Sequence, residues 1–205
     1  NGKVVLKNIN LNFKSKQVKL KMIFKETKLK GNYLINLELK EDERGFFARY
    51  YCEKEFSQKG LNTKWVQVNN SASKEIGTLR GLHYQREPHA EVKLVRCLRG
   101  AIWDVVVDLR DKSKTFGKWF GTVLSDENRT MMYVPKGFAH GFISLKPNSE
   151  ILYMVSSFYS SKSESTLIWS DKKVGIKWFI KPKVISSKDL SGISLDNTIP
   201  IKLKS

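Results

Sequence analysis

The stretch GTLRGLHYQREPHAEVKLVRCLRG, residues 77–100, predicts two neighbouring β-strands, the first carrying His83 and the second Lys93. A lead-in that contains Gly77, Arg80 and Gly81 precedes the histidine. A base, a cation and a close approach of the backbone are the parts of a site for an anionic or carbonyl-bearing ligand. We therefore expect the rest of the chain to be organised around this stretch.

The segments around it also alternate in the manner of β-strands. Between residues 65 and 110, turns that contain Gly or Pro separate the runs WVQVNN, TLRGLHYQ, VKLVRCL and AIWDVVVDLR. In the last run Trp103, Val105, Val107 and Leu109 share one face, while Asp104, Val106 and Asp108 share the other. An aspartate on a half-apolar face is either a rim residue or the buried partner of a cation.

Gly81 lies within the strand that carries His83. Strict alternation places Gly81 and His83 on one face of this strand and Arg80 on the other. Arg80 and His83 can reach the same ligand only if the strand bends or bulges at the glycine. We therefore expect an irregularity at Gly81.

Length and composition indicate one globular domain. The chain has 205 residues, of which 40% are hydrophobic, enough to bury a sizeable core. We assign residues 22–205 to a single domain and treat residues 1–21 as an N-terminal extension of uncertain origin. No apolar run approaches the roughly 20 residues that span a bilayer, and no signal peptide is evident. We expect a cytoplasmic protein with no membrane partner, in which Cys52 and Cys97 are buried free thiols.

The formal net charge is +17. Such a charge can indicate a nucleic-acid partner. Lysine supplies most of the excess, however, and is spread along the chain without a recognition helix, a zinc-finger spacing or an aromatic RNA-binding signature. The pattern favours a basic solvated surface, and we expect no nucleic-acid partner.

A second histidine lies in Pro135–Lys–Gly137–Phe–Ala–His140, a PxGxxH spacing that supplies one metal ligand in cupin barrels. A metal site of that kind also needs an HxH pair and a carboxylate, but the corresponding place reads His83-Tyr84-Gln85. We therefore expect no metal. His140 alone could be a hydrogen-bonded structural residue or a ligand contact.

Two further features could be either structural or functional. The charged turn before the aromatic residues 46–51 predicts a hairpin whose rim carries Arg44 and Arg49, and these arginines could equally form surface ion pairs. Tyr153 and Tyr159 share one face if their strand is regular, where tyrosine usually packs rather than reacts.

Six motifs, in order and with similar spacing, resemble the dTDP-4-dehydrorhamnose 3,5-epimerase family. The resemblance covers about residues 37–189 and rests on LRGLHYQ (79–85), VKLVRCLRGAIWDVVVDLR (92–110), S-x-TFGKW (113–119), VPKGFAHGF (134–142), Y-x5-Y (153–159) and S-x-KD (186–189). It implies an all-β fold, a cupin-type jelly-roll β-barrel with short flanking helices, that uses no metal or cofactor. It also implies a homodimer that shares strands and an isomerase that moves protons at the carbons flanking the 4-keto group of a nucleotide sugar in dTDP-L-rhamnose synthesis.

The resemblance also implies roles for individual residues. His83 matches the general base, Asp189 its orienting carboxylate, Lys93 the cation that stabilises the enolate oxygen, and Tyr153 the acid that returns a proton to the opposite face. The expected lining of the nucleotide-sugar pocket is Arg44, Phe47, Gln67, Asn69, Arg80, His140 and Tyr159. Two positions depart from the family pattern: Arg49, where a glutamate is usual, and Glu91, where a glutamine is more frequent.

Other functions compatible with the same barrel are separated by specific features. A related epimerase could act at one carbon only or on a different nucleotide, and the motifs do not distinguish these reactions. A cupin that only binds a sugar or a nucleotide would not need His83, Lys93 and Tyr153 together. A metal-dependent cupin oxygenase would be recognised by a bound transition metal.

Overall fold

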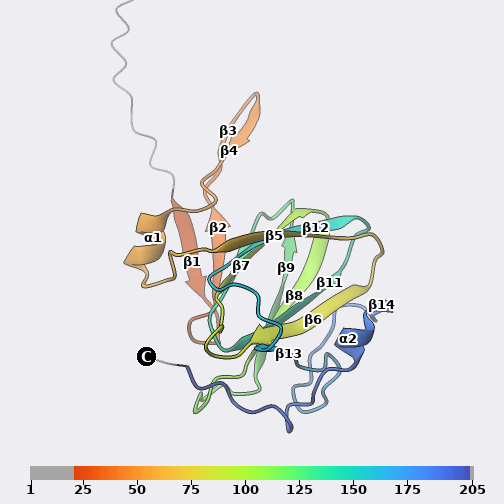
Figure 1. Ribbon diagram of the computed structural model, residues 1–205. Coiled ribbons are helices and arrows are strands. Elements are labelled where there is room, and N and C mark those ends of the chain that lie inside the picture. Colours follow the sequence, from red (N-terminus) through yellow and green to blue (C-terminus); the bar gives the residue numbers. More distant parts are fainter. Residues whose placement is uncertain (1–20, 204–205) are drawn as a thin grey trace, which may run out of the picture.

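The computed structural model describes residues 21–203, so the predicted extension lies outside the described residues except for Lys21. Most of the chain forms two β-sheets (Figure 1). The strand order of the first sheet is β1 (Met22–Glu26), β2 (Tyr33–Leu37), β10 (Met131–Val134), β7 (Lys93–Arg99), β12 (Ser149–Val155) and β5 (Gln67–Ser73). The order of the second is β13 (Glu164–Thr166), β6 (Thr78–Gln85), β11 (Phe138–Ser144), β8 (Ala101–Asp108) and β9 (Trp119–Ser125), with β14 (Val184–Ile185) parallel to β6.

The remaining elements are small and lie at the periphery. Strands β3 (Lys40–Asp42) and β4 (Gly45–Phe47) form a hairpin that projects beyond the two sheets (Figure 1). The helices are α1 (Glu53–Gln58), beside the first sheet, and α2 (Ser187–Leu190), beside β6 and β14. This arrangement confirms the predicted all-β jelly-roll barrel with short flanking helices.

Apolar side chains from both sheets fill the space between them. Val95 of β7 and Ile151 of β12 pack in one cluster with Ile102 and Val106 of β8 and with Phe142 of β11. Each of these side chains is 5% exposed or less. Removing so much apolar surface from water holds the two sheets together, at roughly 1.5–3 kcal/mol for each fully buried large side chain.

The second sheet is covered on its outer face as well. Val105 and Val107 of β8 point outward and pack against Leu167, Val174 and Ile201 from the C-terminal segment. Trp103 and Leu109 belong to the same outer cluster, whereas Val106 belongs to the inner one. The predicted division of residues 101–110 into two faces is therefore confirmed.

The irregularity expected at Gly81 is also present. In the pairing of β6 with β11, His83 lies opposite His140 and Arg80 opposite Phe142, with a register shift between the two pairs. Gly81 has a φ of +113°, and a Cβ built on it would lie 2.7 Å from the Cα of Gly141 and 2.7 Å from the carbonyl oxygen of His140. Only glycine fits here without displacing the neighbouring strand.

We expect Gly81→Ala to lower the free energy of unfolding by about 2–4 kcal/mol, because it combines a disfavoured φ with a backbone overlap. Urea denaturation monitored by circular dichroism would measure the loss. Gly60 serves as a matched control, since it also has a positive φ but no atom within 4 Å of its built Cβ. If the two alanine variants lost the same stability, the overlap at Gly81 would not be costly.

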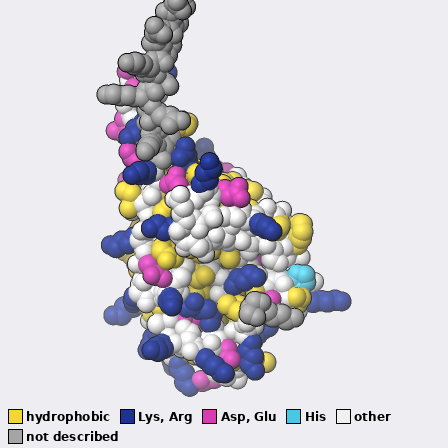
Figure 2. Space-filling view, turned by 90° about the vertical axis from the view of Figure 1, so that its left-hand side faces the viewer, with side chains coloured by type: hydrophobic (Ala, Val, Ile, Leu, Met, Phe, Trp, Pro, Cys, Tyr) yellow, Lys and Arg dark blue, Asp and Glu magenta, His cyan; other side chains and the backbone are white. Residues whose placement is uncertain are grey.

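The cysteines and the charged residues behave much as the sequence predicts. Both cysteines are free, and Cys97 is buried as predicted, but the predicted burial of Cys52 is wrong, since this side chain is only partly buried. Figure 2 displays lysine and arginine side chains scattered over one face of the molecule, with acidic side chains among them. This distribution is that of a solvated surface rather than of a single basic stripe.

Within residues 21–203, no helix has the length and apolar character needed to cross a bilayer.

Candidate active site

Two adjoining cavities open between the sheets, and three of the four predicted catalytic residues lie where they meet. A cavity of about 430 Å³ is lined by strands of both sheets and by α2. A second one, of about 350 Å³, extends toward β5 and β13. His83, Lys93 and Tyr153 line both cavities. Together the cavities form one cleft that could hold a ligand with two chemically distinct parts.

His83 and Asp189 form a hydrogen-bonded pair on one side of the cleft. His83 Nε2 lies 2.6 Å from Asp189 Oδ1, and the histidine side chain is 32% exposed. Burial raises the pKa of Asp189, but its hydrogen bond with His83, its attraction to that imidazole when protonated, and further hydrogen bonds lower it more, so the net direction is down. An ionised carboxylate that accepts from Nε2–H leaves the Nδ1 lone pair free to take a proton.

Helix α2 presents Asp189 to the histidine. Ser186 precedes the helix, and its Oγ accepts a hydrogen bond from the Asp189 backbone N–H at 3.1 Å. This is the usual N-cap arrangement, and it fixes the first turn of a helix that is only four residues long. Strand β14, immediately before the helix, pairs with β6 and so brings the whole segment next to His83.

Lys93 and Tyr153 come from neighbouring strands of the first sheet. Lys93 lies opposite Val155, and Tyr153 lies opposite Val95, so the two side chains are diagonal neighbours on one face. Burial raises the pKa of Tyr153, as does the negative charge of Glu91, while Arg80 lowers it. A phenol that keeps its proton is suited to act as a donor.

His140 is the centre of a second histidine–carboxylate pair. Its Nε2 lies 2.7 Å from Asp104 Oδ1, and the side chains are 8% and 0% exposed. His140 also lines the larger cavity. The hydrogen bond confirms the structural interpretation of His140, and its place at the cavity leaves a ligand contact as a prediction. Asp104 proves to be the buried partner of an ionisable side chain rather than a rim residue.

The structure brings four more of the predicted pocket residues to the cleft. Arg80 lines the larger cavity, where its Nη2 donates to the Ala72 carbonyl at 3.0 Å. The smaller cavity is lined by Gln67, Asn69 and Tyr159. Gln67 Oε1 accepts from the Tyr159 backbone N–H at 2.9 Å, which ties β5 to the loop after β12.

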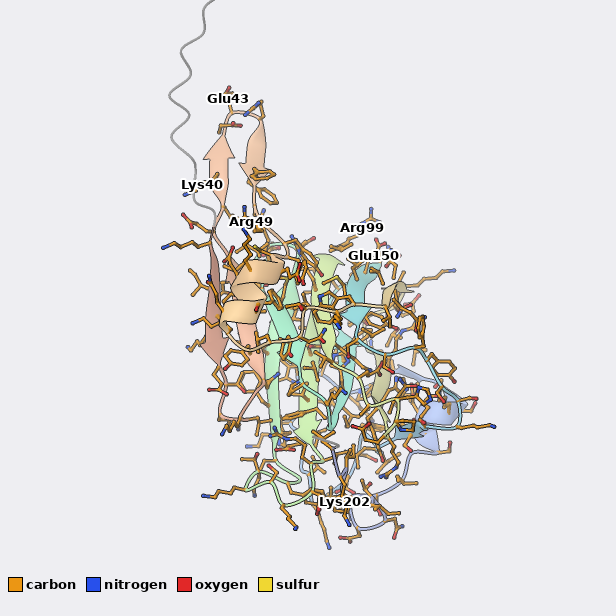
Figure 3. The ribbon with its side chains drawn as sticks, turned by 60° about the vertical axis from the view of Figure 1, so that its left-hand side comes forward. Lys40, Glu43, Arg49, Arg99, Glu150 and Lys202 are labelled. Atoms are coloured by element: carbon orange, nitrogen blue, oxygen red, sulfur yellow. The ribbon has the colours of Figure 1, made fainter. Side chains whose placement is uncertain are left out.

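Arg44 and Phe47 do not lie at the cleft of their own chain. Both belong to the projecting β3–β4 hairpin, where Arg44 pairs with Asp42 and Phe47 is 67% exposed. In Figure 3, Glu43 marks the tip of this hairpin, away from the barrel. The predicted hairpin is confirmed, and so is an ion pair at Arg44. Arg49 pairs with Glu55 of α1, with 3.1 Å between Nη1 and Oε1.

Three charged residues at the cleft were given no role from sequence. Lys188 lines the larger cavity, and its Nζ lies 2.5 Å from Glu164 Oε1. Glu164 and Glu91 line the smaller one. The position of Lys188 next to Asp189, a predicted catalytic residue, could have predicted that this lysine lies at the cleft. Glu164 reaches the site through the three-residue strand β13, which has no periodic pattern in the sequence. Among residues 21–203, no group of three or more His, Cys, Asp or Glu is arranged to hold a metal ion.

Comparisons with known proteins agree with this geometry. The family model of dTDP-4-dehydrorhamnose 3,5-epimerase matches residues 26–197. The enzyme of that name from Salmonella typhimurium is 41% identical over 180 residues, which cover 87% of this chain and 98% of the relative.

Solved structures are similar over most of the fold. An epimerase from Legionella pneumophila, in complex with dTDP-4-keto-L-rhamnose, has a TM-score of 0.84 at 34% identity, covering 90% of this chain and 100% of that one. The dTDP-4-dehydrorhamnose 3,5-epimerase from Bacillus anthracis, with TDP and PPi bound, has a TM-score of 0.82 at 41% identity, covering 85% and 99%.

Proposed function

Because the chain belongs to the dTDP-4-dehydrorhamnose 3,5-epimerase family, we propose that its cleft epimerises a 4-keto nucleotide sugar with His83, Lys93 and Tyr153. The activity is that of the family: an isomerase of the dTDP-L-rhamnose pathway that acts on dTDP-4-dehydro-6-deoxy-D-glucose. The observation that carries the residue assignments is the meeting of a base, a cation and a phenol at the junction of the two cavities.

The proposed reaction begins with removal of a proton from a carbon next to the 4-keto group. A ketone's α-hydrogen becomes acidic enough for a histidine base only when the developing enolate oxygen meets a preorganised positive charge. His83, oriented by Asp189, takes the proton, and the Lys93 ammonium stabilises the oxygen. Tyr153 projects from the other sheet, so it can return a proton to the face opposite the base and invert the carbon.

The direct test is proton NMR of dTDP-4-keto-6-deoxyglucose with the enzyme in deuterated water. We expect the ring-proton signals at C3 and at C5 to disappear as both positions exchange. Exchange at one position would instead favour a single-centre epimerase. Binding of the nucleotide without exchange at either carbon would favour a protein that only binds the sugar nucleotide.

Arg44 and Phe47 are best explained by a homodimer in which each hairpin serves the cleft of the other subunit. The hairpin projects beyond its own barrel, the Arg44 side chain is 82% exposed, and Phe46 and Phe47 are 46% and 67% exposed. A two-stranded hairpin with exposed aromatic side chains is marginally stable by itself. A partner cleft would cover the phenylalanines and give Arg44 a diphosphate to bind, since guanidinium donors pair well with phosphate oxygens.

A mixed dimer tests this exchange of hairpins. The double variant Arg44→Ala/Phe47→Ala is expected to raise KM about 10- to 100-fold, and His83→Ala is expected to be inactive. In mixed dimers, the cleft with an intact His83 receives the unmodified hairpin, so random mixing should restore about a quarter of the wild-type sites. If each hairpin served its own cleft, mixing the two variants would restore nothing.

We also propose that residues 22–205 act as one catalytic domain in the cytoplasm. The C-terminal segment supports the single domain, because Leu167, Val174 and Ile201 pack directly on the second sheet. The two free cysteines favour a reducing compartment.

A further inference from the structure

Glu91 places a carboxylate in the cleft that the proposed mechanism does not use. It lies two residues before Lys93, the first residue of β7. Glu91 Oε1 lies 3.1 Å from Lys93 Nζ, and the side chains are 12% and 10% exposed. The carboxylate lines the smaller cavity together with His83 and Tyr153.

The second oxygen of this carboxylate is also engaged. Gln85 Nε2 lies 3.4 Å from Glu91 Oε2 and donates to the carbonyl oxygens of His89 and Phe158 at 3.0 and 3.2 Å. Gln85 Oε1 accepts from the Ser160 backbone N–H at 2.6 Å. Gln85 is 4% exposed, and its hydrogen bonds to the backbone of His89, Phe158 and Ser160 hold its side chain in place. Glu91 is thus paired with the lysine at one oxygen, and its other oxygen makes a longer contact with the Gln85 amide.

The pair makes the charge of Lys93 tolerable in this position. An ammonium that leaves water loses hydration worth several kcal/mol unless an opposite charge compensates. Lysine also has a long flexible side chain, which a contact must hold in one conformation if the charge is to act at a fixed point. A carboxylate at 3.1 Å meets both needs.

We infer that Glu91 is a positioning residue for the epimerisation: it holds the Lys93 ammonium where the enolate oxygen forms and places a negative charge beside Tyr153. The inference rests on the roles proposed for Lys93 and Tyr153. It extends them, because neither role requires a carboxylate at this position.

The negative charge has a consequence for the proton donor. Glu91 is the second cause, after burial, that raises the pKa of Tyr153, and Arg80 acts against both. The other ionisable groups that line the two cavities are His83, Tyr84, Lys93, His140, Tyr159, Glu164, Lys188 and Asp189. A phenol donates only while it is protonated, so activity is present below its pKa and is lost as the pH rises through it. Removing the charge of Glu91 should therefore bring this loss to lower pH.

Two variants separate the positioning effect from the charge effect. Glu91→Ala removes both, and kcat should fall about 10- to 100-fold with KM changed less than about 2-fold. Glu91→Gln keeps an oxygen that can accept from Lys93. Its kcat at the optimum should stay within about 5-fold of wild type, while the alkaline limb of its pH profile moves to lower pH. Glu150→Gln is the matched control, because this carboxylate lies on β12 at the rim with Arg99, pairs with Asn70 and lines neither cavity (Figure 3).

Several results would overturn the inference. An alanine variant with wild-type kcat, or one whose KM rises as much as its kcat falls, would exclude positioning of the lysine. A glutamine variant whose pH profile matches that of Glu150→Gln would exclude the charge effect, and it remains informative even if Glu91→Ala does not fold. Wild-type enzyme that exchanges neither ring proton would refute the proposed function instead, so the two failures are distinguishable.

Discussion

Replacing His83 by alanine should lower exchange of the C3 and C5 hydrogens of dTDP-4-keto-6-deoxyglucose by about 10³-fold or more, because no base of suitable strength remains at the cleft. The group that pairs with His83 is Asp189, and a carboxylate is a much weaker base than an imidazole, so it is a poor substitute for the missing histidine. The measurement is the rate of loss of the two ring-proton signals in deuterated water.

The control for this variant is another histidine. His89 is partly buried, and the described structure does not place it among the residues that line either cavity. His89→Ala should exchange both hydrogens at the wild-type rate. Calorimetric titration with dTDP should give His83→Ala a Kd within a few-fold of wild type, which would show that the cleft is intact. Near-normal exchange by His83→Ala would mean that another group abstracts the proton.

Alternation and glycine chemistry predicted the parts of the fold that depend on neighbouring residues. The two faces of residues 101–110 follow from period-two alternation, and the irregularity at Gly81 follows from the need to bring Arg80 and His83 to one ligand. Both are local consequences of strand geometry. The same reasoning left Asp104 with two possible roles, because its partner His140 lies 36 residues away.

The features that residue patterns could not predict depend on contacts between residues that lie far apart in the sequence. The tail beyond residue 161 has few regular elements, and its role as the cover of the second sheet appears only through the packing of Leu167, Val174 and Ile201. Asp189 meets His83 across 106 residues, a pair that the family resemblance indicated and no spacing rule could. The hairpin was predicted, but its separation from the cleft was not, because local patterns do not fix the direction in which a hairpin projects.

Tyr153→Phe should separate the two halves of the reaction. Without a proton donor on the face opposite His83, inversion should slow about 10²-fold or more. The base can still remove a proton, exchange it with solvent and return deuterium to the face it came from. Deuterium should therefore enter the substrate faster than the epimer forms, whereas wild-type enzyme couples the two processes.

The comparison that decides the role of Tyr153 is between deuterium incorporation by mass spectrometry and epimer formation by NMR in the same sample. Tyr33→Phe is the control, since Tyr33 lies on β2 outside the residues that line the cavities and should leave both rates unchanged. Equal loss of exchange, inversion and dTDP affinity in Tyr153→Phe would make the tyrosine a binding residue. Exchange that survives without inversion would identify Tyr153, the partly buried phenol of the first sheet that lines both cavities, as the donor that inversion requires.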